Sequence, residues 1–383
     1  MYRITYLIII ISLFTSCDEK DGQEIDFTTI EKKKIQLNFA MREMISTTQC
    51  KNIEGTDYLF RFIDYQSQQK PQALEIINLT SERVEKIINF PMEGPNAFDG
   101  LVNFHVHNFD SIFFHNEAFP LTFYLTDTSK VIKQKWEIED MEIGAGWSAN
   151  SAPFLIDDRL YFHSFSTQSF YPDEQDFIEN EFLSYLHLRT GAITPISSVD
   201  FPKIFKENFR NGKWFPWSES PILHHYNNKM FVGFMMSPEV TSIKEGQTEK
   251  IKLEISQSKL AVPVSIDIND YASNFYSLIG NSQLSKIIYD PYRKKLIRLF
   301  KRSIEIGENE DRESVYYRSK FDLLFFDLNG KLVATLELPK NKINPSVIIP
   351  TEKGLLINTD NPFNPENHED YLEFNHISID NLQ

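Results

Sequence analysis

Two histidines two residues apart, His105 and His107, could do metal chemistry. They lie in the segment VNFHVHNFDSIFFHN, residues 102–116, whose alternating side chains indicate a strand. In a strand, residues two apart point to the same side, so both imidazoles could reach one metal ion. A zinc site needs three or four ligands, and neighbouring segments add only His163, His224 and His225. We therefore expect hydrogen-bonded histidines on a strand, with a shared metal at His105 and His107 as the alternative.

Three loops rich in glycine, asparagine and tryptophan hold a second group of residues suited to binding. They read MEGPNAFDG, EIGAGWSANSAP and FRNGKWFPWSESP. Loops tend to carry function, and tryptophan is enriched at binding hot spots. The predicted ligand-binding residues are Asn96, Trp147, Asn150, Trp214 and Trp217. The alternative is that these tryptophans pack between structural elements as core.

Three further loops are long and acidic, and they read YPDEQDFIENEF, SIEIGENEDRES and TDNPFNPENHEDY. Their carboxylates could attract a basic partner or bind calcium. None has the regular spacing of an EF-hand, so solvated surface loops are the alternative. We expect no resident cofactor, with calcium or a metal in a central channel as the exceptions.

The overall charge and the motif content exclude several function classes. A formal net charge of −15 argues against a nucleic-acid partner, because phosphate binding draws on clustered lysine and arginine. The sequence lacks a Walker loop, a dinucleotide-binding fingerprint, HExxH and GxSxG. The corresponding nucleotide-binding, metalloprotease and serine-hydrolase families are therefore excluded.

The N-terminal segment MYRITYLIIIISLFTSC indicates export. Arg3 precedes an apolar run from Ile4 to Phe14, which is shorter than the roughly 20 residues of a membrane-spanning helix and is typical of a signal peptide. The end of the segment, LFTSC, resembles a bacterial lipobox, although Phe14 stands where leucine is usual. The resemblance implies a signal peptide over residues 1–16 and lipid attachment at Cys17, with an ordinary secretory signal as the alternative.

The stretch after Cys17 is polar and has no apolar periodicity, so residues 17–32 are predicted to form a flexible tether. Its acidic start resembles the export signal of Bacteroidetes-type lipoproteins. That resemblance implies a membrane-anchored lipoprotein of the cell envelope, in the outer membrane. With Cys17 lipidated, Cys50 has no partner for a disulfide, so stability must come from packing within residues 33–383.

The elements that must position these residues are short strands between turn signals. FDLLFFDLNGKLVATLEL is a hairpin whose turn, Asn329-Gly330, predicts type I′ geometry. Similar outer hairpins are ALEIINLTSERVEKIINF, LTFYLTDTSKVIKQKWEI and FLSYLHLRTGAITPIS, and a poorly bounded one lies in KIKLEISQSKLAVPVSIDI. A more apolar hairpin precedes each of them, as in PFLIDDRLYFHSF, ILHHYNNKMFVGF, IIYDPYRKKLIRLF and VIIPTEKGLLINT.

With the opening histidine segment and a fainter turn at Glu54-Gly55, six inner hairpins recur along the chain. Their spacing is typical of propeller blades with long loops. We therefore predict an all-β fold, a six-bladed β-propeller with four antiparallel strands in each blade. The body opens with one unpaired strand, KKIQLNF, and ends with another, YLEFNHISI. Pairing of these N- and C-terminal strands would close the last blade.

The lipobox-like start, the six hairpin pairs and the turn PMEGPNAFDG together resemble Bacteroidetes lipoproteins of unknown function with a TolB-like six-bladed propeller. Gly94-Pro95-Asn96 is similar to the glycine-proline turn common in that group. The resemblance implies a fold and a location and supplies no catalytic residues.

Two functional hypotheses from different classes follow. The first is a non-catalytic binding or assembly module that presents a propeller face to a peptide, glycan or protein partner. The second is a metal-dependent hydrolase or lactonase-like enzyme with its site in the central channel. We favour the first, because matched Asp, Glu and His positions do not recur on successive inner strands.

Overall fold

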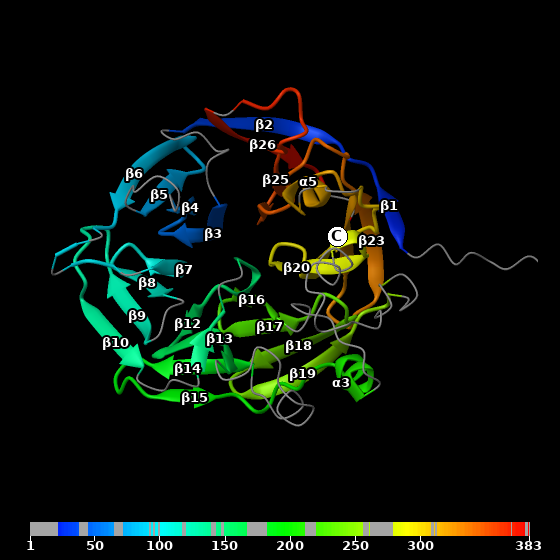
Figure 1. Cartoon of the computed structure of the whole chain (residues 1–383). Coiled ribbons are helices and arrows are strands. Elements are labelled where there is room, and N and C mark those ends of the chain that lie inside the picture. The colour runs from blue at the N-terminus through cyan, green and yellow to red at the C-terminus, as the bar shows by residue number, and fades with distance from the viewer. Residues whose placement is uncertain are drawn as a thin grey trace, which may run out of the picture.

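The computed structural model describes most of the residues of the chain. It covers residues 22–37, 45–64, 72–91, 93–94, 96–98, 100–116, 120–138, 143–146, 149–166, 182–210, 220–255, 260, 279–307, 310, 312–368, 370–379 and 382. These residues are mainly strands, in sheets of four to eight strands that together form a ring (Figure 1). The predicted all-β fold is therefore confirmed.

Four of the sheets follow one another along the chain. One holds, from the inside of the ring outward, β7 (Leu101–Asn108), β8 (Ser111–Asn116), β9 (Leu121–Thr126) and β10 (Gln134–Ile138). The next holds β12 (Phe154–Ile156), β13 (Arg159–Ser166), β14 (Leu183–His187) and β15 (Ile193–Pro195), with the short β11 (Ile143–Ala145) paired to β13. The third holds β16 (Ile222–Tyr226), β17 (Lys229–Gly233), β18 (Glu239–Lys244) and β19 (Gln247–Lys252). The fourth holds β20 (Gln283–Asp290), β21 (Lys295–Lys301), β22 (Phe321–Phe326), β23 (Leu332–Glu337) and β1 (Gln23–Ile25).

The eight-stranded sheet consists of two halves. One half is β3 (Ile45–Ile53), β4 (Thr56–Asp64), β5 (Ala73–Asn78) and β6 (Arg83–Asn89). The other is β24 (Ile348–Thr351), β25 (Gly354–Asn358), β26 (Tyr371–Ile377) and β2 (Thr29–Gln36). Strands within each half are antiparallel, whereas the halves meet through one parallel pair, Gln36 of β2 and Arg83 of β6.

The predicted pairing of the N- and C-terminal strands is present. Strand β2 runs antiparallel to β26, from Thr29 opposite Ile377 to Gln36 opposite Tyr371, and Figure 1 shows the two lying side by side. Strand β1 adds to the edge of β23. Paired strands thus begin at Gln23, inside the segment 17–32 that was predicted to be a tether. The apolar pattern missed β1 because an edge strand is held by backbone hydrogen bonds, which do not depend on side-chain periodicity.

The hydrophobic core lies between neighbouring sheets. Phe62 of β4 and Phe114 of β8 come from different sheets, and their ring centroids lie 5.9 Å apart. A middle strand is covered on both faces, so every residue of β22 is buried, whereas the outermost β10 alternates between exposed and buried residues. Packing between sheets therefore accounts for the high phenylalanine content.

Two hairpin turns differ from the prediction. Of the pair Asn329-Gly330 only Gly330 has a positive φ, of 89°, and its N–H donates to the carbonyl of Asp327 at 3.1 Å. The turn is therefore type I followed by a left-handed glycine, and the predicted type I′ geometry is wrong. Both central residues have positive φ at Glu54-Gly55 and at Glu245-Gly246, as type I′ requires. The second of these turns joins β18 to β19, so the outer hairpin of that sheet spans residues 239–252 and precedes most of the segment predicted for it.

Short helices occupy some connections. They are η2 (Ala149–Ser151), α3 (Lys203–Arg210) and α5 (Arg312–Tyr317). Within the described ranges, none of the helices combines the length and the apolar composition that crossing a bilayer would require.

Candidate functional site

The innermost strands lie nearest the centre of the ring (Figure 1). They are β3, β7, β12, β16, β20 and β24, and each forms the inner end of a run of paired strands. Titratable side chains gather on four of these strands. They are Cys50 and Lys51 of β3, His105 and His107 of β7, His224 and His225 of β16, and Lys286 of β20.

His105 joins three of the inner strands. It is 2% exposed, and its Nε2 accepts a hydrogen bond of 3.2 Å from the backbone N–H of Leu155 in β12. Gln49 of β3 lies 3.3 Å from Nδ1, and its amide also bonds to both backbone groups of Val106. An accepting Nε2 carries no proton, so the neutral ring holds its proton on Nδ1 and the Gln49 approach is a packing contact. Burial, with the charge of Lys51, lowers the pKa of His105 well below its usual value.

His105 belongs to a group of basic residues from β3, β7 and β16. We call Lys51, His105, His107 and His225 the histidine cluster. Burial and then the charge of Lys51 lower the pKa of His107 and of His225, the latter to about 4. The ring of His225 stacks on Phe154 with centroids 5.0 Å apart, and its buried Nε2 has no hydrogen-bond partner. The cluster therefore combines Lys51 with three imidazoles whose pKa values burial and the charge of Lys51 lower.

A second group lies where β3, β16 and β20 face one another. Lys286 donates from Nζ to the carbonyl of Ser346, and burial lowers its pKa to about 8. Burial lowers the pKa of His224 to about 3, with His225 and Lys286 adding to the effect. Cys50 is exposed to solvent, yet the strands around it desolvate the thiolate and raise its pKa to about 12. A thiol with so high a pKa is a poor nucleophile near neutral pH.

The alternative prediction, a metal ion shared by His105 and His107, lacks the further ligands that it needs among the described residues. Across the described part of the chain, His, Cys, Asp and Glu side chains form no group of three that could hold a metal ion. The lone pair of His105 Nε2 is taken up by Leu155. His105 is therefore a structural residue, and His107 is the more exposed of the two.

The turns of the inner hairpins bring aromatic and acidic side chains to one end of the ring. Tyr226 is 37% exposed and Tyr292 is 48% exposed. Burial raises the pKa of Tyr292, and the nearby charges of Asp57 and Glu352 raise it further. We call Asp57, Tyr226, Tyr292 and Glu352 the turn-end cluster. The four residues come from four different inner hairpins, so the turns of these hairpins lie near one another.

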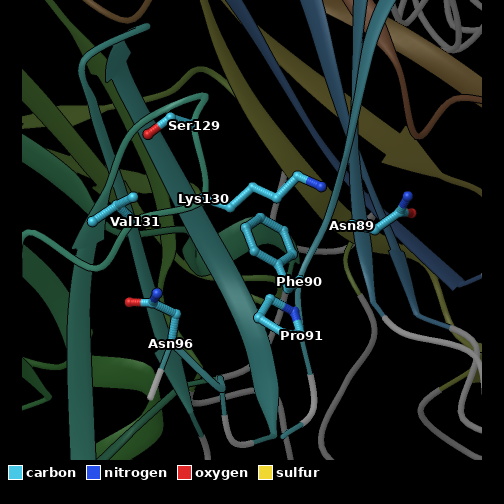
Figure 2. Close-up of a pocket in the computed structure, with 7 residues that line it drawn as sticks. All are labelled: Asn89, Phe90, Pro91, Asn96, Ser129, Lys130 and Val131. Atoms are coloured by element: carbon cyan, nitrogen blue, oxygen red, sulfur yellow. The ribbon is translucent and has the colours of Figure 1, made fainter. Parts of the chain in front are cut away.

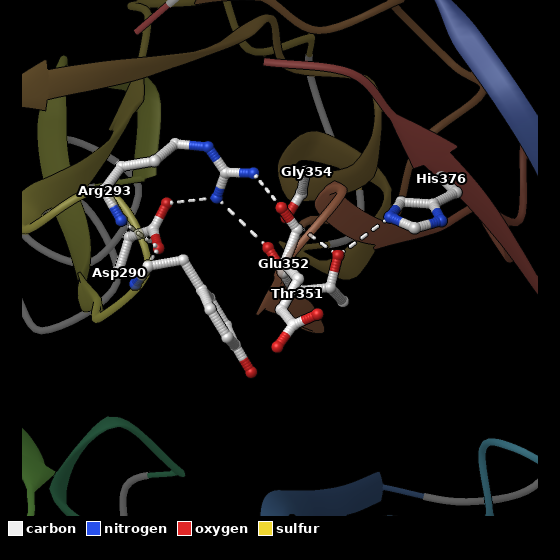
Figure 3. Close-up of polar contacts among 7 residues, drawn as sticks. Asp290, Arg293, Thr351, Glu352, Gly354 and His376 are labelled. Atoms are coloured by element: carbon white, nitrogen blue, oxygen red, sulfur yellow. Dashed lines mark hydrogen bonds and ion pairs between the residues drawn. The ribbon is translucent and has the colours of Figure 1, made fainter. Parts of the chain in front are cut away.

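Polar contacts fix two of these turns to each other (Figure 3). Arg293 pairs with Asp290 at 2.9 Å and donates to the carbonyls of Thr351 and Glu352 at 3.1 and 2.9 Å. The hydroxyl of Thr351 lies 2.8 Å from Nε2 of His376 in β26. The β20–β21 turn is thereby tied to the β24–β25 turn and to the strand that pairs with the N-terminus.

Asn96, one of the predicted ligand-binding residues, lines a pocket away from the ring centre. The pocket has a volume of about 330 Å³ and lies beside the end of β6 and the turn between β9 and β10 (Figure 2). Its lining residues are Asn89, Phe90, Pro91, Asn96, Ser129, Lys130 and Val131. Asn96 is thus placed between the outer parts of two neighbouring sheets.

Of the remaining residues that were predicted to bind a ligand or a lipid, the structure describes only Asn150. Asn150 is half-buried in η2, beside Ser151, whose hydroxyl donates to the carbonyl of Pro221 at 2.6 Å. The other predicted residues lie outside the described residues, and they are Trp147, Trp214, Trp217 and the lipid-attachment residue Cys17.

Sequence reasoning missed Lys51, Lys286 and Tyr292 as site residues. All three lie on inner hairpins that the sequence does reveal. The sequence could have indicated them, because each is a basic or aromatic residue on an innermost strand or in its turn, where most residues are apolar. Lys51 lies two residues after Gln49, on the side of β3 that faces β7.

Comparisons with known proteins agree with the fold and give no activity. Residues 50–333 match a family described as "Domain of unknown function (DUF4221)". A solved member of that family from Bacteroides vulgatus is 15% identical, with a TM-score of 0.78 over 93% of this chain and 99% of that one.

Two other solved structures match with lower TM-scores. A protein of unknown function from Bacteroides caccae is 10% identical, with a TM-score of 0.40 over 80% and 94% of the two chains. A neuraminidase-like protein from A/bat/Guatemala/164/2009 is 8% identical, with a TM-score of 0.45 over 93% and 96%. Comparison with curated proteins finds no match.

Proposed function

The chain belongs to the DUF4221 family, and from that premise we propose that it is a lipid-anchored binding module of the cell envelope. It holds a peptide, a glycan or a segment of a partner protein at the turn end of the ring. It carries out no catalysis on this ligand. The convergence of Asp57, Tyr226, Tyr292 and Glu352 in the turn-end cluster is the observation that carries the proposal.

The proposed scaffold is a six-bladed propeller of the TolB-like type. Counting the halves of the eight-stranded sheet separately gives six sets of four antiparallel strands, each with its innermost strand toward the centre. The weak junction between the halves, one pair at Gln36 and Arg83, supports counting them as two blades. Pairing of β2 with β26 then makes the last blade from both ends of the chain.

The proposed location is the outer membrane, through a lipid on Cys17 after removal of residues 1–16. Several acyl chains on one residue hold a protein firmly, at about 0.8 kcal/mol per buried methylene. Labelling of bacterial cells with radioactive palmitate tests this. The wild-type protein should carry the label and fractionate with the outer membrane, whereas Cys17→Ala should carry none. Label that persists on Cys17→Ala would refute the assignment.

The turn-end cluster suits a polar ligand with flat or cationic groups. The exposed tyrosines offer ring faces and hydroxyl groups, which bind sugars and peptides with little loss of side-chain entropy. The carboxylates of Asp57 and Glu352 accept hydrogen bonds at the same place. Asn96, Trp147, Asn150, Trp214 and Trp217 remain the predicted second contact region, formed by the loops between blades.

The metal-dependent hydrolase is the weaker alternative. It would need His105 as a ligand together with His107, but Nε2 of His105 already accepts the N–H of Leu155. Freeing that nitrogen would leave a buried N–H without a partner. We therefore carry the binding module forward.

Native mass spectrometry of the protein extracted from its own membrane tests the binding proposal, followed by titration with envelope peptides and oligosaccharides. The double variant Tyr226→Ala, Tyr292→Ala should lose at least 10-fold in affinity with an unchanged melting temperature. Phe363→Ala is the matched control, because Phe363 is 43% exposed but lies in the β25–β26 connection, at the other end of β25. Equal losses in both variants, or no retained ligand, would contradict the proposal.

A further inference from the structure

The inner strand β3 carries a lysine, Lys51, that has no ion pair within the described part of the chain, in a protein whose net charge is −15. Lys51 lies on β3, and burial lowers its pKa. Among the ion pairs of the described residues, none joins Lys51 to a carboxylate. A partly desolvated cation without a partner is costly, and an anion bound beside it offsets that cost.

Hydrogen bonds between the inner strands bring the segments with three potential donors near one another. Gln49 bonds to both backbone groups of Val106, which fixes β3 against β7 near Lys51 and His107. His105 accepts the N–H of Leu155, which fixes β7 against β12.

The stack of Phe154 on His225 then fixes β12 against β16. These contacts place the inner strands that carry Lys51, His107 and His225 near one another, although the three residues are far apart in the sequence. Lys51 lies close enough to lower the pKa of both histidines.

The hydrogen-bonding state of these residues leaves capacity for a ligand. His107 is exposed, and Nε2 of His225 has no hydrogen-bond partner. A backbone bond to Asn227 occupies the other nitrogen of the His225 ring. Protonation of either ring would create a charged donor next to the ammonium of Lys51, which is the arrangement that binds an oxyanion.

We propose that Lys51, His107 and His225 bind an oxyanion, a carboxylate or phosphate group carried by the ligand. This proposal rests on the proposed function. It identifies the part of the ligand that enters the ring, while the turn-end cluster holds the rest of the ligand. In this arrangement the ligand carries its anionic group toward Lys51 and the histidines. Proton uptake accompanies binding, since the anion stabilises the charged form of the imidazoles.

Titration calorimetry at constant ionic strength tests this, with inorganic phosphate and citrate as separate probes that distinguish phosphate from carboxylate. Both should bind more tightly at pH 6 than at pH 8, because His107 and His225 take up protons in the complex. The groups that face His107 are Lys51 of β3, His105 of its own strand and His225 of β16. NMR titration of the histidine ring protons should show higher pKa values for His107 and His225 with the anion present.

Lys51→Gln should weaken binding at pH 6 at least 10-fold. Lys86→Gln is the matched control, because it makes the same charge change on the exposed outer strand β6 of the same half-sheet. If Lys51→Gln does not fold, His107→Asn changes an exposed side chain of the same site and should also weaken binding. Equal affinity in Lys51→Gln and the wild type, equal losses in Lys86→Gln, or no saturable binding at pH 6 would each overturn the inference.

The two proposals fail in distinguishable ways. If the native ligand is retained through Tyr226 and Tyr292 but neither phosphate nor citrate competes with it, the oxyanion site is wrong and the binding module stands. If phosphate binds through Lys51 but no envelope ligand is retained, the binding module is wrong. If no envelope ligand is retained and neither phosphate nor citrate binds, both proposals are wrong.

Discussion

The backbone N–H of Leu155 donates to Nε2 of His105 across the boundary between two sheets, at 3.2 Å. Through this hydrogen bond His105, whose spacing from His107 suggested a metal ligand, connects the inner strands β7 and β12. His107, two residues further on, has no such bond to a neighbouring strand among the described contacts and stays exposed. The pairing of β7 with β8 is irregular between Val106 and Asn108, and the two histidines of this strand have different roles.

The two histidines should differ in their effect on stability. His105→Ala removes a buried ring and leaves the N–H of Leu155 without a partner, so we expect a loss of about 2–4 kcal/mol in the free energy of unfolding. His107→Ala should change it by less than about 0.5 kcal/mol. Urea unfolding of both variants measures the difference. Similar losses would show that His105 is not a structural bridge.

Closure of the ring by the N-terminal strand can be tested within β2. Ile35 is fully buried between the two halves of the eight-stranded sheet, whereas Ile30 is 50% exposed on the same strand. Ile35→Ala should lower the free energy of unfolding by about 2–4 kcal/mol, and Ile30→Ala by less than about 0.5 kcal/mol. Thermal unfolding of the mature chain provides the measurement. A small effect of Ile35→Ala would mean that β2 adds little to the ring.

Gly233 and Arg298 should be coupled. A Cβ at Gly233 would lie 2.5 Å from Nη1 of Arg298, which is fully buried and donates from Nη2 to two backbone carbonyls. Gly233→Ala should therefore cost about 1–3 kcal/mol through overpacking. In an Arg298→Ala background the clash with Nη1 is removed and only the 2.7 Å contact with Cδ1 of Ile287 remains, so the cost should fall by about 1 kcal/mol. Additive losses in this double-mutant cycle would contradict the contact.

Asp360 should make stability depend on pH. Burial, with the charge of Glu373, raises the pKa of its carboxyl to about 7, from 3.8 for the free side chain. Because the folded-state pKa is raised, the contribution is complete below about pH 4 and is lost as the pH rises through 7. The shift corresponds to roughly 4 kcal/mol at most.

Asp360→Asn should remove much of this slope. Urea unfolding at pH 5 and pH 8 should therefore show a smaller difference for Asp360→Asn than for the wild type. Asp110→Asn, at an exposed turn, serves as the control and should keep the wild-type slope. An unchanged slope in Asp360→Asn would show that this carboxyl is ionised in the folded protein at neutral pH.

Several features were predictable because they are local. A hairpin is made by neighbouring residues, so alternation and turn residues reveal it, and the inner hairpins at residues 104–116 and 222–234 coincide with β7–β8 and β16–β17. One turn was predicted wrongly, also for a local reason. Asn-Gly favours type I′ only as a tendency, and Asn329-Gly330 takes another turn that places Gly330 against the carbonyl of Lys252 in the next sheet.

By itself the sequence determined most of the strands, most of their hairpin pairing and the pairing of β2 with β26, because each of these depends on a run of residues. Tertiary structure alone decided which side chains meet at the centre. Lys51, His107 and His225 lie on separate strands, and their convergence depends on how the sheets are arranged around the ring. No local pattern encodes that arrangement, since it is set by packing between whole sheets. The grouping of Lys51 with the histidines of β7 and β16 therefore emerges only in the folded ring.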